Sequence, residues 1–279
     1  MKTGITWHYR GNGSDAATLE KLKSDGYATL DLQNLVGTEE GIMTFGTHEF
    51  EKTLKEIGRT AAESGMELWQ THGPWVWPVI YDGSPEGVVR RLRQMEKAAY
   101  GTALAGAKYM AIHPMMPYGV NGEEPEKTKE MNLDFWYLVG EKAKEYGTVV
   151  CLENMPWKDF TYGSPYPVLD LVKEIGLPSV KMTLDTGHSA DCGVSPADAV
   201  RAIGKDYLAI LHVHDNDGVR DNHWLPFEGT IDWKAFMTAL KDVGFDGSLS
   251  IEGSFLPKAN RYSDSKESGE VCRRLLALA

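Results

Sequence analysis

The chain has 279 residues, of which 42% are hydrophobic and 25% are charged, so it is long enough to bury one large core. Its formal net charge of -11 at pH 7 disfavours polyanionic partners, namely nucleic acid and anionic membrane surfaces. The three cysteines lie far apart and form neither a disulfide framework nor a CxxC metal motif, a pattern typical of the reducing cytoplasm. No apolar run approaches the roughly 20 residues that a membrane span needs, and we therefore expect a cytoplasmic protein without a membrane partner.

Strand-like runs alternate with amphipathic helical patterns along the whole chain. Short runs rich in apolar and β-branched residues predict strands at 4–9, 27–32, 66–71, 108–112, 148–152, 180–184, 207–211 and 248–251. Apolar residues at helical spacing, several of them behind a serine cap or a first-turn proline, predict a helix that begins at 195 and others at 14–23, 48–63, 84–103, 126–145, 164–175, 232–243 and 265–278.

Eight strand–helix alternations indicate βαβ units around a parallel sheet. Eight units in roughly 250 residues match the size of a (β/α)8 TIM barrel, so we predict an α/β fold with a single TIM barrel domain over residues 1–279. A doubly wound open sheet is the rival fold. It would place its ligands at one crevice, whereas this chain carries ligand-type residues after nearly every strand.

Imidazoles and carboxylates follow the predicted strands. The densest stretch, residues 211–229, begins as an apolar run and then holds His212 and His214, which point to the same side of a strand because they are two residues apart. Asp221 and His223 follow in the same stretch, for which a solvated loop with capping aspartates is the alternative interpretation. All strand ends of a closed barrel meet at one face, so one rim would collect His72, His113, Glu153, Asp185, His188, His214 and Glu252.

Four of these groups follow the fifth to eighth strands and could bind one divalent cation, namely Glu153, Asp185, His214 and Glu252. Three carboxylates so close together would raise one another's pKa unless a cation lies among them. Oxygen ligands with one imidazole suit Mn2+, Mg2+, Co2+ or Zn2+ without selecting one of them. Salt bridges to lysine and arginine are the alternative, but the strand ends carry few basic residues.

Four short motifs carry a resemblance to a known family: Leu152-Glu153-Asn154, Leu184-Asp185-Thr186-Gly187-His188, His212-Val213-His214-Asp215-Asn216-Asp217 and Ile251-Glu252. Together they resemble the xylose-isomerase-like TIM barrel superfamily, which includes sugar isomerases and epimerases and also endonuclease IV. The resemblance covers essentially the whole chain. Each motif alone is a weak signal; the set is strong for the superfamily and says little about the substrate.

The resemblance to the D-tagatose 3-epimerase branch implies one divalent ion, with Mn2+ expected, held by Glu153, Asp185, His214 and Glu252. It also implies that His188, Arg220 and Asp159 bind the sugar, although the branch has glutamate where this chain has Asp159. With one ion, His72 and His113 become hydrogen-bonding groups that contact the substrate.

The same resemblance implies a proton transfer through a cis-enediolate. The ion would chelate the carbonyl O2 and hydroxyl O3 of a ketose, which lowers the pKa of the adjacent C–H bond. Glu153 and Glu252 are then the catalytic residues, since one removes the C3 proton and the other returns a proton from the opposite face. We therefore expect a sugar isomerase or epimerase that acts on a ketose or a related small sugar. Four tryptophans near the same rim could pack on that sugar: Trp7, Trp75, Trp157 and Trp224.

Other functions stay open at this point. Endonuclease IV holds three zinc ions, and its nine ligands have counterparts here, with Asp221 and His223 as additional metal ligands. The net charge of -11 and the acidic loop at 37–41 disfavour binding to the phosphates of DNA, so no nucleic-acid partner is expected. A metal-dependent sugar eliminase or lyase is a third reading, and a sugar-binding barrel without turnover is a fourth. The sequence leaves oligomer formation and the identity of the sugar open.

Overall fold

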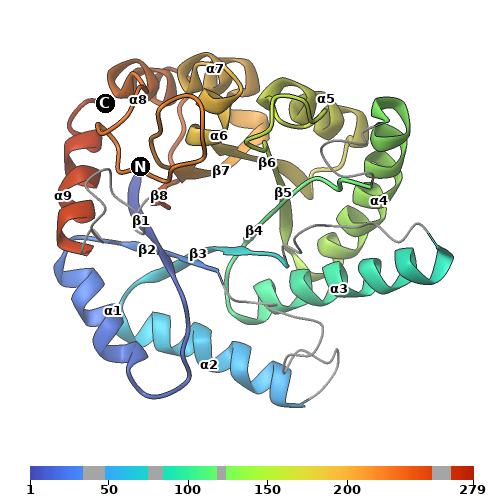
Figure 1. The fold of residues 1–279 in the computed structure, drawn as a ribbon. Helices are drawn as coiled ribbons and strands as arrows, with labels where there is room; N and C mark the ends of the chain where they lie inside the picture. Colours follow the sequence, from blue (N-terminus) through green and yellow to red (C-terminus); the bar gives the residue numbers. More distant parts are fainter. Residues whose placement is uncertain (34–47, 75–83, 118–123, 253–264) are drawn as a thin grey trace.

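Eight parallel strands close into a barrel in the computed structural model, which describes residues 1–33, 48–74, 84–117, 124–252 and 265–279 (Figure 1). The strands are β1 (Lys2–Trp7), β2 (Thr29–Leu32), β3 (Glu67–His72), β4 (Tyr109–Ile112), β5 (Val149–Glu153), β6 (Val180–Asp185), β7 (Leu208–Val213) and β8 (Ser248–Ile251). Each strand pairs with its neighbours in the sequence, and β8 returns to β1. The predicted (β/α)8 TIM barrel is therefore confirmed, and the open sheet is excluded.

Helices surround the barrel (Figure 1). They are α1 (Asp15–Ser24), α2 (His48–Ser64), α3 (Pro85–Leu104), α4 (Pro125–Tyr146), α5 (Pro165–Ile175), α6 (Thr186–Asp191), α7 (Pro196–Tyr207), α8 (Trp233–Asp242) and α9 (Ser265–Leu276). Among the helices in the described ranges, none is long and apolar enough to cross a membrane.

The core lies between the strands and these helices, where both faces of the strands are covered. Every residue of β7 is buried, which explains why its first four residues, 208–211, form a continuous apolar run rather than an alternating one. Helix α2 buries Phe50, Leu54, Ile57 and Ala61, which lie on one face because helical neighbours recur every three to four residues. The apolar residues that recur at helical spacing in the sequence are thus the residues with which the helices cover the barrel.

Several helices begin as the sequence predicts. Proline occupies the first turn of α3, α4, α5 and α7. The side chains of Ser84 and Ser164 accept hydrogen bonds from the first turns of α3 and α5. Ser14 and Ser195 precede α1 and α7 as predicted, but their side chains make no cap hydrogen bond in the described structure.

The short helix α6 was not predicted. It begins directly after β6, and Asp185 caps it by accepting a hydrogen bond from the backbone N–H of His188 at 2.7 Å. Six residues are too few to show an apolar period, so these residues were interpreted only as a ligand motif. The consequence is that Asp185 and His188 are held by one helical turn.

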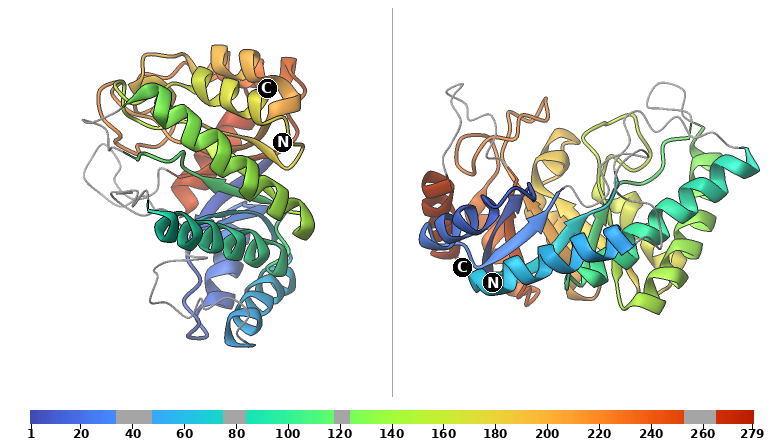
Figure 2. Two further views of the ribbon diagram at one scale, coloured as in Figure 1. Left: turned by 90° about the vertical axis from the view of Figure 1, so that its right-hand side faces the viewer. Right: turned by 90° about the horizontal axis from the view of Figure 1, so that it is seen from below.

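The two ends of the barrel carry different segments of the chain. The loop between β7 and α8 projects from the face where the strands end (Figure 2, right, orange). The N-terminus, where β1 begins, lies on the opposite side in the same view (Figure 2). In TIM barrels the loops at the carboxyl ends of the strands carry the active site. We therefore expect the functional site at the rim formed by the carboxyl ends of β3 to β8.

Candidate metal centre

Among the described residues, ten imidazole and carboxylate side chains gather at this rim in three groups, and within each group the ligand atoms lie within 4.8 Å of one another. The central group consists of Glu153, Asp185, His212 and Glu252. The β3–β5 group consists of His72, His113 and Glu153. The loop group consists of His188, His214, Asp221 and His223. Glu153 belongs to two groups and therefore joins them.

The central group places carboxylates around one imidazole. His212 Nδ1 lies 2.9 Å from Glu153 Oε1 and 3.1 Å from Glu252 Oε2. Glu153 is buried, and its Oε2 has no hydrogen-bond partner in the described structure. Burial alone would raise the pKa of Glu153, but His212 and the neighbouring His72 hold that pKa well below its usual range. The group therefore presents anionic oxygens to a buried space, which is the environment of a cation site.

Two imidazoles face the other oxygen of Glu153 in the β3–β5 group. The Nε2 atoms of His72 and His113 each lie 3.7 Å from Glu153 Oε2. Burial, reinforced by the charge of His72, lowers the pKa of His113 to about 3, so His113 is neutral at neutral pH. A neutral imidazole is the form that binds a metal ion.

The loop group centres on Asp221. Its carboxylate lies 3.4 Å from His188 Nε2 and 3.2 Å from His223 Nε2. Burial opposes ionisation, yet these two imidazoles hold the pKa of Asp221 far below its usual range. Burial also lowers the pKa of His223, but the hydrogen bond that its imidazole donates to Asp221 and the charge of Glu252 raise that pKa to about 9. The rings of His214 and His223 stack with their centroids 4.1 Å apart.

Within the described residues, the side chains of His72, His188 and His223 share one orientation, in which Nδ1 faces a backbone carbonyl and Nε2 faces the ligand group. The Nδ1 atoms of His72, His188 and His223 lie 2.8, 2.8 and 3.3 Å from the backbone oxygens of Gly73, Asn154 and Glu252. A carbonyl oxygen only accepts, so each Nδ1 carries the proton and each Nε2 is directed into its group. Metal-binding histidines are usually held in this way. His214 is oriented differently, with Nε2 2.9 Å from Asp185 and a buried Nδ1 without a partner in the described structure.

Backbone contacts fix β5, β6 and β7 relative to one another at this rim. The side chain of Asn154 accepts from Asp185 N at 3.0 Å and donates to Asp185 O at 3.1 Å. Thr186 Oγ1 donates to His214 O at 2.7 Å and accepts from His214 N at 3.0 Å. A Cβ atom on Gly187 would lie 2.0 Å from the His214 ring, so this position requires glycine. The ligand groups therefore lie on a rigid frame.

A buried carboxylate organises the loop that carries Asp221 and His223. Asp215 follows β7 and accepts hydrogen bonds from five donors: Asn216 N at 3.0 Å, Ile231 N at 3.2 Å, Phe227 N at 3.1 Å, Gly229 N at 3.0 Å and Trp233 Nε1 at 2.8 Å. Asp215 is fully buried, so these bonds are shielded from water. The position of the loop group thus depends on Asp215.

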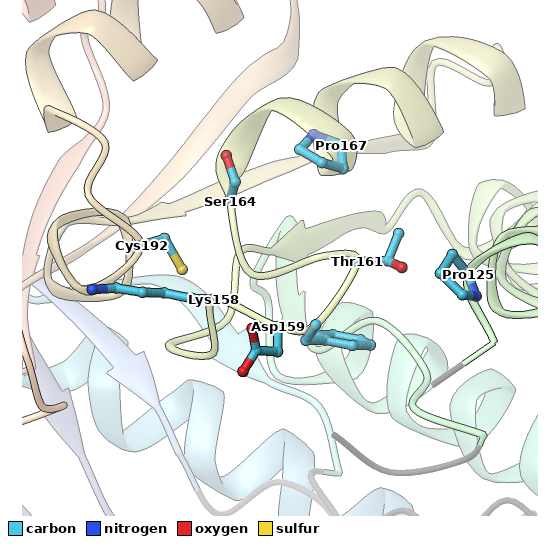
Figure 3. A pocket seen from close by; sticks show the side chains of 8 residues that line it. Pro125, Lys158, Asp159, Thr161, Ser164, Pro167 and Cys192 are labelled. Atoms are coloured by element: carbon cyan, nitrogen blue, oxygen red, sulfur yellow. The ribbon is translucent and has the colours of Figure 1, made fainter. Parts of the chain in front are cut away.

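The structure brings most of the predicted site residues together, and two further ones, Asp159 and Arg220, are not part of the three groups. Asp159 lines a cavity of about 420 Å3 with Lys158 and Cys192, and none of the ten grouped side chains is among its lining residues (Figure 3). Arg220 is exposed on the β7–α8 loop, where its backbone N–H donates to Asp217 at 3.0 Å.

Three of the four tryptophans named above lie within the described residues. Trp7 is buried, and Trp157 and Trp224 are half-buried. Trp75 and the acidic loop at 37–41 lie outside the described residues.

The sequence did not assign His212, Asp31 or Asn154 to the site. His212 was recognisable, because it shares a strand side with His214, and only the structure groups His212 with Glu153 and Glu252. Asp31 interrupts a short apolar strand, which is a detectable signal of a buried polar role. Asn154 acts through backbone contacts that no sequence pattern predicts.

Comparisons with known proteins extend this picture. A family model described as xylose isomerase-like TIM barrel matches residues 19–274. An uncharacterized protein of Methanocaldococcus jannaschii is 28% identical over 246 residues, which is 85% of this chain and 80% of that protein. A D-psicose 3-epimerase of Ruminiclostridium cellulolyticum is 30% identical over 208 residues, which is 71% of this chain and 67% of the epimerase. The solved structure of the IOLI protein with a bound zinc atom superposes with a TM-score of 0.75 at 16% identity, covering 99% of this chain and 97% of that one.

Proposed function

The chain belongs to the xylose isomerase-like TIM barrel family, and on that premise we propose that it is a divalent-metal-dependent isomerase or epimerase of a ketose or related small sugar. One observation carries the proposal: three carboxylates and an imidazole surround a buried space at the rim, and an oxygen of Glu153 there lacks a hydrogen-bond partner. The similarity to a D-psicose 3-epimerase supports the substrate class.

We assign the cation to Glu153, Asp185, Glu252 and one imidazole. The resemblance to epimerases assigns His214, while the grouping of ligand atoms favours His212. Three oxygen ligands suit Mn2+, Mg2+ and Co2+, and the zinc in the similar IOLI structure adds Zn2+ to the candidates. Replacing His212 and His214 in turn by asparagine shows which imidazole is the ligand, because loss of a ligand lowers metal affinity more than loss of a neighbouring group.

The chemistry then follows from the two glutamates. When bound, the cation would polarise the ketose carbonyl and stabilise the charge that develops on its oxygen. Glu153 lies at the end of β5 and Glu252 follows β8, so the two carboxylates come from separate strands and can approach a substrate from different sides. One takes the C3 proton and the other returns a proton to the opposite face, with His188 as a hydrogen-bond donor to the substrate.

Metal analysis combined with a panel of ketoses tests the proposal. We expect one divalent ion per chain and inversion at C3 of at least one ketose. Glu153→Gln and Glu252→Gln should each reduce turnover by about 10²–10⁴-fold, the usual value of a positioned proton-transfer group. Glu228→Gln is the matched control, since Glu228 lies on the β7–α8 loop and outside the three groups. Wild-type turnover in either test variant removes that glutamate from the mechanism.

A second candidate is a multi-metal phosphodiesterase similar to endonuclease IV. The observation in its favour is that the β3–β5 and loop groups supply ligands beyond the central group. Three zinc ions would then occupy the rim, because a zinc site takes about four ligands and a bridging carboxylate serves two ions. The net charge of -11 opposes binding of a phosphate backbone. Close to three zincs per chain, together with incision of an abasic duplex, would select this function instead.

A third candidate, a sugar eliminase or lyase, would use the same base and cation. Product analysis separates it from the epimerase, because elimination yields an unsaturated product and epimerisation conserves the formula.

A further inference from the structure

A buried carboxylate inside the barrel approaches the imidazole of the central group from behind. Asp31 lies on β2, is 1% exposed, and places Oδ2 3.3 Å from Nε2 of His212 on β7. His212 is fully buried, and its Nε2 makes no hydrogen bond that meets geometric criteria within the described structure, so Asp31 Oδ2 faces it at contact distance only. The other nitrogen, Nδ1, faces Glu153 and Glu252. The ring is thus held between an interior carboxylate and the ligand carboxylates.

Asp31 is itself held in place by polar neighbours. Its Oδ2 accepts from Gln33 Nε2 and Gln70 Nε2, each at 3.0 Å, and from Ser250 Oγ at 3.4 Å. No lysine or arginine of the described chain forms an ion pair with it, and it is absent from the three ligand groups. A buried carboxylate without a basic partner destabilises the folded state. His212 is therefore the neighbouring group with which the charge of Asp31 can interact.

His212 differs from the histidines whose Nδ1 atoms donate to backbone carbonyls. Those rings present Nε2 to their groups, whereas His212 presents Nδ1 and directs Nε2 into the barrel. A neutral imidazole carries one proton. If that proton lies on Nε2 and is donated to Asp31, the lone pair on Nδ1 faces the central group.

We propose that Asp31 is a positioning residue that accepts the Nε2–H of His212 and thereby fixes the tautomer in which Nδ1 binds the cation. The proposal rests on the proposed function, because it presupposes a cation at the central group. A carboxylate behind a ligating histidine also increases the basicity of that ligand, and loss of such a partner typically lowers metal affinity by 10–100-fold.

Zinc affinity, measured by competition with a chelator on the full chain, separates positioning from simple structural support. Asp31→Ala should lower zinc affinity by about 10–100-fold. Asp31→Asn retains an oxygen acceptor and should recover part of that loss. Ser250→Ala is the matched control, because Ser250 donates to the same oxygen and is equally buried but leaves the His212 contact intact. It should keep the wild-type affinity within about threefold.

A second measurement uses the wild-type protein and does not depend on how the variants fold. Long-range 15N–1H NMR of histidine-labelled, zinc-loaded protein reports which ring nitrogen carries the proton, with His212→Asn used for assignment. We expect the proton of His212 on Nε2. A proton on Nδ1, or equal zinc affinity of Asp31→Ala and wild type, overturns the role of Asp31 alone. Failure of the wild type to bind any divalent cation overturns the proposed function as well.

Discussion

Replacing Asp215 by asparagine tests whether one buried carboxylate holds the loop group. The amide oxygen can replace one carboxylate oxygen, but the NH2 group must then face the donors of the other, which are two or three N–H groups. Each buried donor left without an acceptor costs about 1–3 kcal/mol. The variant should therefore destabilise the folded conformation of the loop by about 2–9 kcal/mol.

Hydrogen exchange measures this loss directly at the affected backbone amides. We expect the amides of Phe227, Gly229 and Ile231 to exchange at least about 30-fold faster, the factor that corresponds to 2 kcal/mol. Asp217→Asn is the control, because Asp217 accepts two backbone hydrogen bonds on the same loop but is exposed. It should change stability by less than about 0.5 kcal/mol. Unchanged protection of the three amides in Asp215→Asn would show that the Asp215 carboxylate does not hold this loop.

Three further predictions concern the frame and charge of the rim. Gly187→Ala places a Cβ 2.0 Å from the His214 ring and should lower zinc affinity more than about tenfold in a chelator competition. Burial raises the pKa of Asp191 to about 6. The stabilisation that comes from the neutral carboxyl is therefore present below about pH 3.8 and is lost as the pH rises through 6. Asp191→Asn should raise the melting temperature of the metal-free protein at pH 7.5 and barely change it at pH 4. Burial lowers the pKa of His223, but Asp221 raises it to about 9. The free energy of unfolding of the metal-free protein should therefore fall between pH 6.5 and 9.5. His223→Gln should flatten that fall, as measured by urea titrations.

The barrel could be predicted because its signals are local. Apolar runs such as residues 207–211 are long enough to identify a buried strand, and prolines at the starts of helices mark their boundaries. Closure of the barrel then brings His72 and Glu252 to one rim even though they are far apart in the sequence. The convergence of ligand-type residues at the rim therefore follows from topology.

The direction of each side chain within the rim could not be predicted. His212 and His214 share a strand side, so alternation does not decide which of them faces Glu153. The positions of Asp221 and His223 depend on a loop that is folded around Asp215, through contacts between residues up to 18 apart in the sequence. Asp31 acts across the barrel interior on β7. Such contacts depend on three-dimensional packing and leave little trace in a single sequence.

Solvent deuterium exchange tests the proposed chemistry most directly. Incubation of metal-loaded protein with a panel of ketoses in deuterated water, followed by 1H NMR, reports loss of the C3 proton signal whether or not the product is known. We expect deuterium at C3 of at least one ketose with the wild type and with Glu228→Gln, and a rate lower by about 10²–10⁴-fold with Glu153→Gln. Exchange at no ketose carbon, with one or more divalent ions bound, would contradict the proposed function.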